Sequence, residues 1–184
     1  GACKGHDGQV GLFCVGDGET YNVPVEMAET RYGIRVDEHS LHTDGAGAGE
    51  YRGGSGAVRV YRSMNENQTF TASFGRNKWP VWGAAGGKDG SVNYFQFIDA
   101  DGTVSEPMGI AARRVMNTND VVRMVTATGG GYGNPFKRPA EKVAMDVKNE
   151  YITVEQAKAD YGVLVDPETF KVLGLTEERQ KAEK

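Results

Sequence analysis

The sequence contains no long hydrophobic run, since no apolar stretch approaches the ~18 residues that a membrane-spanning helix requires. Basic residues are not in excess either: 21 lysines and arginines face 25 aspartates and glutamates, for a net charge of −4. A nucleic-acid-binding protein would be expected to display a basic face. No secretory signal is visible. We therefore expect no membrane and no nucleic acid among the partners, and a cytoplasmic location.

Cysteine and histidine are also scarce. The two cysteines, Cys3 and Cys14, do not form a Cys-x-x-Cys motif, so no zinc site is expected. Without a secretory signal we interpret both as free thiols, Cys14 as a small buried residue of an apolar strand. His39 and His42 lie in a segment that reads as a strand, where a spacing of three directs them to opposite faces. No metal ligand is predicted in this chain.

Complete nucleotide-binding and catalytic motifs are missing as well. There is no strand–GxGxxG–helix unit, no Walker A sequence and no nucleophile elbow. The glycine cluster at 129–133 does follow an apolar strand, but Pro135 and further loop residues separate it from the first helix behind it. Phosphate binding at a helix N-terminus is therefore the weaker interpretation of this cluster, and tight-turn packing the stronger one.

What the sequence has in abundance is glycine: 26 of 184 residues, about twice the usual share of ~7%. The glycines gather in clusters that separate short runs of alternating apolar and polar residues, as in a β-rich protein with many tight turns. Beyond Pro139 the apolar residues recur at helical spacing instead. The sequence thus predicts a mainly β fold with α/β character: a glycine-rich sandwich or barrel-like body over residues 1–135, then a short helical tail over residues 136–184.

The local patterns predict individual elements. At 153–156 the spacing of Thr and Gln matches a capping box, and Gly33 and Gly162 are suited to end helices. Strands 57–62 and 69–74 are close enough in sequence to form a β-hairpin, and 109–116 is ambiguous between strand and helix. The remaining predicted strands are 9–15, 34–41, 91–99, 121–127 and 163–167, and the predicted helices are 22–32, one from 140, one from 153 and one over 176–184.

Two loops contain side chains suited to function. His6 and Asp7 lie together between glycines, and a histidine beside a carboxylate can act as a general base or, with further ligands nearby, hold a metal. No further ligand is close in sequence, so a solvated loop is the plain alternative. Trp79 and Trp82 flank a proline, where they would either line a pocket or interface or anchor the loop to the core.

The order of the motifs resembles the carboxy-terminal third of the hydantoinase B family. The segments that carry the resemblance are 22–26 (NVPVE), 51–56 (YRGGSG), 82–87 (WGAAGG), 129–135 (GGGYGNP) and the tail segments 151–157 (YITVEQA) and 160–163 (DYGV). The stretch 3–6 (CKGH) departs from the Arg-Pro-containing version expected in the family, so substrate specificity is not implied.

The resemblance implies a component of an ATP-dependent cyclic-amide hydrolase of the N-methylhydantoinase or 5-oxoprolinase type, not active alone. A ketone carboxylase of the acetone or acetophenone type and a purely structural module are the alternatives. The implied partners are an amino-terminal companion from the same B-type subunit, an A-type ATP-binding subunit and a small-molecule substrate, in a hetero-oligomer. ATP and a divalent metal would be bound by those partners. The start at Gly1 is interpreted as a split gene or a cleaved precursor.

Within that framework we select site residues from the loops that would lie nearest the companion chain. His6 and Asp7 are predicted to act as acid–base groups or as hydrogen-bond partners of a substrate amide, and Asn22 to orient a carbonyl. Glu26 and Arg52 are predicted to bind substrate, with Arg52 holding an anion.

Overall fold

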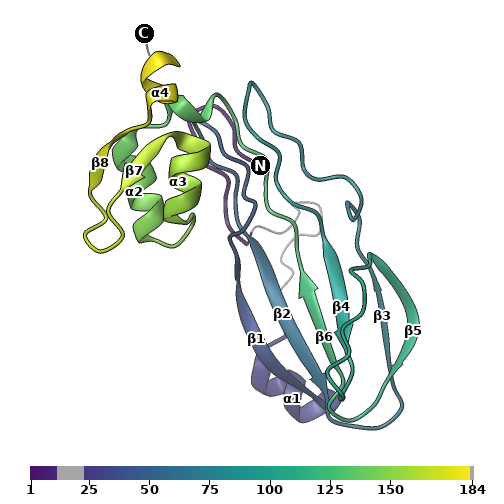
Figure 1. The fold of residues 1–184 in the computed structure, drawn as a ribbon. Helices are drawn as coiled ribbons and strands as arrows, with labels where there is room; N and C mark the ends of the chain where they lie inside the picture. The colour runs from purple at the N-terminus through teal and green to yellow at the C-terminus, as the bar shows by residue number, and fades with distance from the viewer. Residues whose placement is uncertain (12–22, 183–184) are drawn as a thin grey trace.

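The largest element of the computed structural model, which describes residues 1–11 and 23–182, is a four-stranded antiparallel sheet (Figure 1). Its strand order is β1-β2-β6-β4. Directly opposite residues in the register share a face, so Arg59 of β2 lies beside His39 of β1 and Met124 of β6. The strands are β1 (Ile34–His42), β2 (Gly56–Ser63), β6 (Val121–Val125) and β4 (Tyr94–Ile98).

A two-stranded ribbon packs on one side of this sheet. It consists of β3 (Gln68–Ser73) and β5 (Ile110–Met116), so the ambiguous segment is a strand. Phe70 of the ribbon contacts Phe95 and Phe97 of β4 edge-on, with ring centroids 5.7 and 5.5 Å apart. These aromatic contacts bury the apolar side of the ribbon and fix its place on the sheet.

The predicted hairpin between 57–62 and 69–74 is wrong. Although both segments are strands, β2 pairs with β1 and β6, whereas β3 pairs with β5. Alternation predicts that a segment is a strand but carries no information on which strand it pairs with. Here β3 lies in the second layer, where its Phe70 packs on Phe95 and Phe97 of β4. The packed sheets do not close into a barrel in the described part of the chain, so of the two predicted forms the structure has open, layered sheets.

Between the sheet and the helical region, four extended segments run side by side; we call them the glycine bundle (residues 1–9, 45–56, 82–90 and 126–134; Figure 1). They are joined by backbone hydrogen bonds, for example from Gly47 N to Gly129 O at 2.9 Å and from Gly8 N to Arg52 O at 2.7 Å. A Cβ built on Gly53 would overlap the carbonyl of Gly129. Glycine is required there because the backbones touch directly.

The tail after the bundle is mainly helical and has its own core. The predicted capping box at Thr153 is confirmed, with Gln156 N donating to Thr153 Oγ1 and Thr153 N donating to Gln156 Oε1. Gly162 ends that helix in the left-handed conformation as predicted. The tail consists of η2 (Pro135–Lys137), α2 (Ala140–Lys148), α3 (Val154–Tyr161), β7 (Val163–Val165), β8 (Val172–Leu175) and α4 (Glu177–Ala182).

The remaining described helix, α1 (Val25–Tyr32), leads into β1 and ends at Gly33, which has φ of 61° as predicted for a helix terminator. The predicted strand over 9–15 lies mostly outside the described residues, as does Cys14. Strand β8 was not predicted. The division of the chain into a body over residues 1–135 and a tail over 136–184 stays a prediction.

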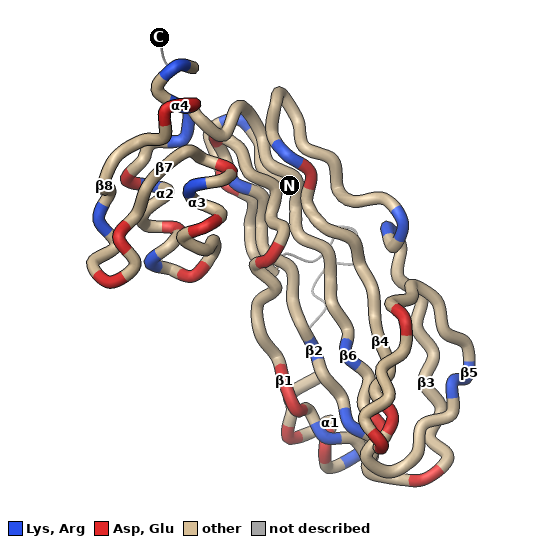
Figure 2. Tube along the Cα trace, viewed as in Figure 1, with Lys and Arg blue, Asp and Glu red and all other residues tan. Residues whose placement is uncertain are grey.

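Charge is distributed unevenly along the molecule. Lysines, arginines, aspartates and glutamates cluster around the tail and around α1 with the adjoining strand ends (Figure 2). The glycine bundle between them holds fewer charged residues, namely Lys4, Asp7, Glu50, Arg52, Lys88 and Asp89. The few charged side chains that the bundle does contain are therefore candidates for special roles.

Among the described helices, none combines the length and the apolar composition that a membrane span needs.

Candidate functional site

A groove of about 920 Å³ extends from the glycine bundle onto the four-stranded sheet. Its floor follows alternating residues of two neighbouring chain segments, since these side chains share a face. Ala57 and Thr126 lie opposite each other there, with Thr126 N donating to Ala57 O at 2.9 Å and Ala57 N donating to Thr126 Oγ1 at 2.7 Å. The floor residues are Ser55, Ala57 and Arg59 on one segment and Met124, Thr126 and Thr128 on the other.

His6 stands at the bundle end of the groove, on a tight turn. Cys3 N donates to His6 O at 3.1 Å, and His6 N donates back to Cys3 O at 3.0 Å. Gly5 has φ of 92°, a conformation that favours glycine and closes the turn. His6 and Cys3 are both exposed and both line the groove. The turn therefore presents an imidazole and a thiol to whatever occupies this end.

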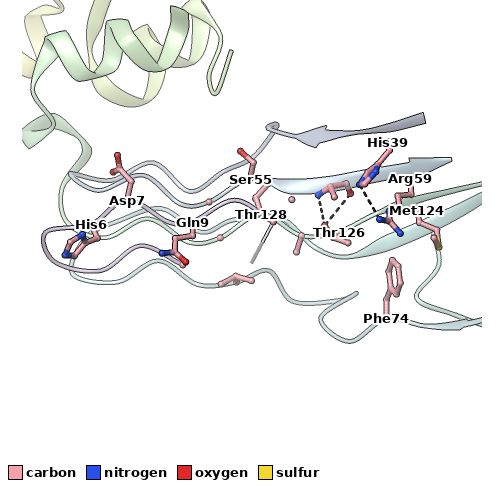
Figure 3. Close-up of a pocket in the computed structure, with 18 of the residues that line it drawn as sticks. His6, Asp7, Gln9, His39, Ser55, Arg59, Phe74, Met124, Thr126 and Thr128 are labelled. Carbon is pink, nitrogen blue, oxygen red and sulfur yellow. Dashed lines mark hydrogen bonds between the residues drawn. The ribbon is translucent and has the colours of Figure 1, made fainter. Parts of the chain in front are cut away.

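Asp7 points away from His6, toward the tail (Figure 3). There Arg138 grips it with two parallel hydrogen bonds, from Nη1 to Oδ1 at 2.7 Å and from Nη2 to Oδ2 at 2.8 Å. The backbone N–H of Arg52 adds a third bond to Oδ1 at 2.7 Å. Because Asp7 directly follows His6, this clamp fixes the chain just after the turn that carries the imidazole.

The clamp continues into the tail through Asp146 of α2. Arg138 Nε and Nη2 bond Asp146 Oδ2 at 2.9 and 2.8 Å. Arg52 Nε lies 3.4 Å from Asp146 Oδ1, outside hydrogen-bond geometry, and its guanidinium stacks 4.3 Å from the ring centroid of Tyr151. Arg138, Asp146 and Arg52 are 2%, 6% and 4% exposed. Two arginines and two aspartates thus join the bundle to the tail in a largely buried network.

The two carboxylates of this network have opposite pKa shifts. Burial alone would raise the pKa of Asp7, but the hydrogen bonds and charge of Arg138, with the Arg52 N–H, outweigh it and lower the pKa. At Asp146 burial prevails and raises the pKa, although the charges of Arg138 and Arg52 offset part of the effect. Asp7 is therefore an ionised, fully occupied carboxylate at neutral pH, which is unlike a free general base.

The other end of the groove lies over the sheet. His39, Arg59, Met124 and Phe74 gather there, far along the floor from His6 (Figure 3). Arg59 Nη1 donates to Tyr61 Oη at 3.1 Å, and Nη2 lies 3.4 Å from His39 Nε2. The groove therefore has a polar, glycine-lined end and an end where a cation meets apolar side chains.

A family model matches residues 1–135, about three quarters of the chain, and its description is hydantoinase B/oxoprolinase. The chain belongs to the hydantoinase B/oxoprolinase family. Among its relatives are an uncharacterized protein of Methanocaldococcus jannaschii, 34% identical over 78% of the chain, and the putative B-type subunit of a D-/L-hydantoinase from a Pseudomonas species, 31% identical over 90%. The beta subunit of the caprolactamase from Pseudomonas jessenii is 30% identical over 90%.

Solved structures agree with this assignment. The ATP-dependent caprolactamase from Pseudomonas jessenii superposes with a TM-score of 0.67, 29% identity and 86% of the chain covered. Nucleotide-free acetone carboxylase shares the fold, with a TM-score of 0.77 over 99% of the chain at 18% identity. The chain spans only about a quarter of each protein: 25%, 28% and 29% of the three sequence relatives, and 27% and 28% of the two structures.

Against this family background, the structure brings together three of the five predicted site residues. His6, Asp7 and Arg52 are neighbours at the bundle end, but Arg52 is buried and its nearby carboxylate is Asp146 of the protein itself. Glu26 lies exposed in the first turn of α1, does not line the groove, and sits at the opposite end of the sheet (Figure 1). Asn22 lies outside the described residues. The functional roles of all five stay predictions.

Sequence reasoning missed Arg138, Asp146 and Arg59. Arg138 and Asp146 lie in tail segments without a distinctive motif, and no local sequence pattern distinguishes a buried arginine or aspartate from a solvated one. Arg59 did carry a signal, because alternation along β2 directs its side chain to the face opposite Val58 and Val60, which pack together in an apolar cluster. Trp79 and Trp82 are 75% and 68% exposed, so of their two predicted roles anchoring the core is wrong.

The metal and the ATP that the family implies do not fit the residues described here. Within residues 1–11 and 23–182, no three side chains of His, Cys, Asp or Glu come together as a ligand set. The glycines at 129–131 are packed against other backbone, since a Cβ on Gly130 would overlap the carbonyl of Trp82, so they leave no open cradle for phosphate. No step below is routed through either group.

Proposed function

We propose that this chain is a component of an ATP-dependent cyclic-amide hydrolase, and that its groove forms part of the substrate pocket. The proposal rests on one observation above all. A family member that is 30–31% identical to a hydantoinase B-type subunit and to a caprolactamase beta subunit holds an open groove with a histidine at its polar end. Both relatives are named for enzymes that open cyclic amides.

His6 is the residue we propose for acid–base work in that pocket. It is exposed, it lines the groove, and its position is fixed by the turn at Gly5 and by the clamp on Asp7. An imidazole held there would transfer a proton to or from the amide nitrogen or the attacking water. Asp7, already occupied by Arg138, would act through His6 as a positioning residue.

We further propose that the chain works only within an assembly. Its relatives are named as subunits, and it spans about a quarter of their length. The rest of a B-type subunit, in the same or a companion polypeptide, would complete the pocket, and an A-type subunit would supply ATP and the divalent metal. The chain by itself is expected to have no turnover.

The proposal is tested by assembling the chain with the rest of a B-type subunit and an A-type subunit, and measuring ATP-dependent hydrolysis of hydantoin, 5-oxoproline and caprolactam. We expect turnover of at least one of them. His6→Ala should lower kcat about 100-fold, the usual contribution of a general acid–base. Lys4→Ala, on the same turn and exposed, is the matched control and should leave kcat unchanged. Turnover by the chain alone would refute the need for partners.

Experiments on the same assembled complex distinguish two other possible functions from the proposed one. A ketone carboxylase would consume acetone or acetophenone with bicarbonate and ATP and leave cyclic amides intact; its support here is the shared fold of acetone carboxylase. A purely structural module would keep full turnover with His6→Ala but lose assembly when the exposed Trp79 and Trp82 are replaced by serine.

A further inference from the structure

Arg59 is the one arginine among the described residues that line the groove, and none of its described partners is a carboxylate. The tyrosine hydroxyl of Tyr61 and the ring of His39 hold two of its nitrogens. Neither group neutralises the guanidinium charge, and a guanidinium presents five N–H donors, so several remain for a ligand. A half-buried arginine without a carboxylate partner is poised to bind an anion.

The contrast with two fully buried arginines of the molecule supports this interpretation. Arg138 is bonded to Asp7 and Asp146, and Arg52 lies beside Asp146. Arg59 differs from both: its guanidinium faces an open groove. The protein thus places these two sealed arginines against its own aspartates, whereas the arginine that lines the groove has no carboxylate among its described partners.

The surroundings of Arg59 strengthen its attraction for an anion. Met124 and Phe74, its neighbours in the groove, are partly buried and pack against the apolar cluster around Phe95, so an apolar wall stands beside the guanidinium. Charge interactions are stronger beside apolar protein than in bulk water. Among the groove-lining residues that are described, the sole carboxylate is Asp7, whose oxygens are already occupied by Arg138 and the Arg52 N–H.

A polar group in the floor of the groove has no internal partner. The hydroxyl of Ser55 is buried, with the residue 7% exposed, and makes no hydrogen bond within the described structure. Ser55 lies on the same floor segment as Arg59, toward the His6 end. Buried hydroxyls without a partner are uncommon in folded proteins, so the floor between His6 and Arg59 holds an unsatisfied polar group just beneath its surface.

We propose that the Arg59 end of the groove is an oxyanion subsite, which binds the carboxylate or phosphate group of a small molecule whose apolar part contacts Met124 and Phe74. His39 and Tyr61 orient the guanidinium, and the bound group takes its remaining N–H donors. The assignment of this anion to the substrate of His6 rests on the proposed function. The binding of an anion by the groove is independent of the proposed function.

The test uses the full 184-residue chain and two probes, hexanoate and inorganic phosphate, with acetate as the reference carboxylate that lacks the longer apolar chain. Binding is followed by calorimetry and by NMR of the arginine side chains. At least one probe should bind and perturb Arg59. If hexanoate binds more tightly than acetate, the anion is a carboxylate with an apolar body; if phosphate binds more tightly than hexanoate, it is a phosphate group. Failure of both probes to bind would overturn the inference.

Arg59→Gln should weaken binding of the preferred probe at least roughly ten-fold, since it replaces the charged guanidinium with a neutral amide that can still donate hydrogen bonds. Arg123→Gln is the matched control: Arg123 is also hydrogen-bonded to a tyrosine hydroxyl, Tyr94 Oη at 3.3 Å, but it projects from the opposite face of the same sheet. It should leave binding unchanged. Equal losses for the two variants would contradict the subsite.

Arg59→Lys guards against a folding defect. It keeps the charge but loses the planar fork of donors, so it should bind with an affinity between those of wild type and Arg59→Gln at unchanged thermal stability. Because binding is measured on the chain alone, this outcome is independent of turnover in the assembly. Binding without cyclic-amide hydrolysis would support the subsite and refute the proposed reaction, and hydrolysis without anion binding would do the reverse.

Discussion

The glycine bundle and the helical tail lie side by side in this protein and bury their chains by opposite means. In the bundle, most contacts are made by backbone N–H and carbonyl groups of neighbouring segments, which bond directly, and few side chains take part. In the tail, the contacts are made by side chains: Val143, Ala157 and Val163 are fully buried in one apolar cluster. One region depends on hydrogen bonds between close backbones, the other on apolar area removed from water.

The difference shows why one region can supply a site while the other supports it. Because backbone hydrogen bonds hold the bundle together, glycine occupies many of its positions and it has few large side chains. A side chain such as that of His6 is therefore exposed, with few other side chains around it. The tail has an apolar core of its own, and it holds the ion pair of Arg138 and Asp146 buried where it meets the bundle. Ala48 of the bundle packs into the tail core, and Arg138 of the tail reaches the bundle, so the two regions are joined both by apolar packing and by buried charge.

The largest expected effect breaks the junction between the two regions. Arg138→Met should lower the free energy of unfolding by about 3–5 kcal/mol, because Asp146 would be left buried without its main partner, and Asp7 would lose its clamp. Urea denaturation measures the loss, and limited proteolysis of the tail reports where it falls.

The control for this variant is Arg114→Met. Arg114 pairs with Asp99 on the surface, with side-chain exposures of 48% and 43%, so its loss should be no more than about 1 kcal/mol. A similar loss for the two variants would mean that the buried network does not join bundle and tail.

A methyl group added within the bundle should have the next largest effect. Gly53→Ala places a Cβ against the carbonyl of Gly129, and the segments must separate, with an expected loss of about 3 kcal/mol in unfolding free energy. Gly75→Ala is the matched control, since a Cβ there meets no atom within 4 Å, and should change stability by less than about 0.5 kcal/mol. A tolerated Gly53→Ala would show that the backbones are not in direct contact.

The tail should respond to the converse change, removal of carbon atoms. Val143→Ala deletes two buried methyl groups and leaves a cavity, so we expect a loss of about 2 kcal/mol by thermal or urea unfolding. Met145→Ala on the same helix, where the side chain is 53% exposed, should have an effect near zero. If both variants lost equally, the tail would not be organised around the cluster of Val143.

The smallest effect concerns the exposed ion pair between the same two regions. Lys88 of the bundle bonds Asp160 of α3 at 2.6 Å, but the side chains are 54% and 31% exposed. Lys88→Met should therefore change the unfolding free energy by less than about 1 kcal/mol, and by still less at high salt. A loss as large as that of Arg138→Met would mean that contact at the surface, and not burial of charge, holds the tail in place.

Much of the local structure was predictable. Helix α1 with its end at Gly33, the alternation in β1, β2 and β3, and the capping box of α3 all follow from patterns within about ten residues. Local signals of this kind depend on propensity, periodicity and capping, which act over short distances. Pairing was not predictable, because β2 and β3 are adjacent in sequence yet belong to different sheets.

The candidate site was predictable only in part. His6 and Asp7 were identified because glycines isolate them in the sequence, but their neighbourhood suggested one shared role. The structure instead turns them to opposite sides, with Asp7 bound to Arg138, 131 residues further along the chain. Glu26 was selected because its segment was expected to lie near the companion chain, and it lies away from the groove. Contacts over such separations leave no trace in local sequence.

The sequence by itself determined the composition of the two regions: glycine clusters too dense for ordinary packing in one, and apolar residues at helical spacing in the other. It also determined the family, through motifs that stand in a fixed order. Only the tertiary structure decided which charges are satisfied internally and which are not. Arg138 and Arg59 are alike as residues, and differ because one is sealed between two aspartates while the other faces a groove. Burial and long-range partners set that difference.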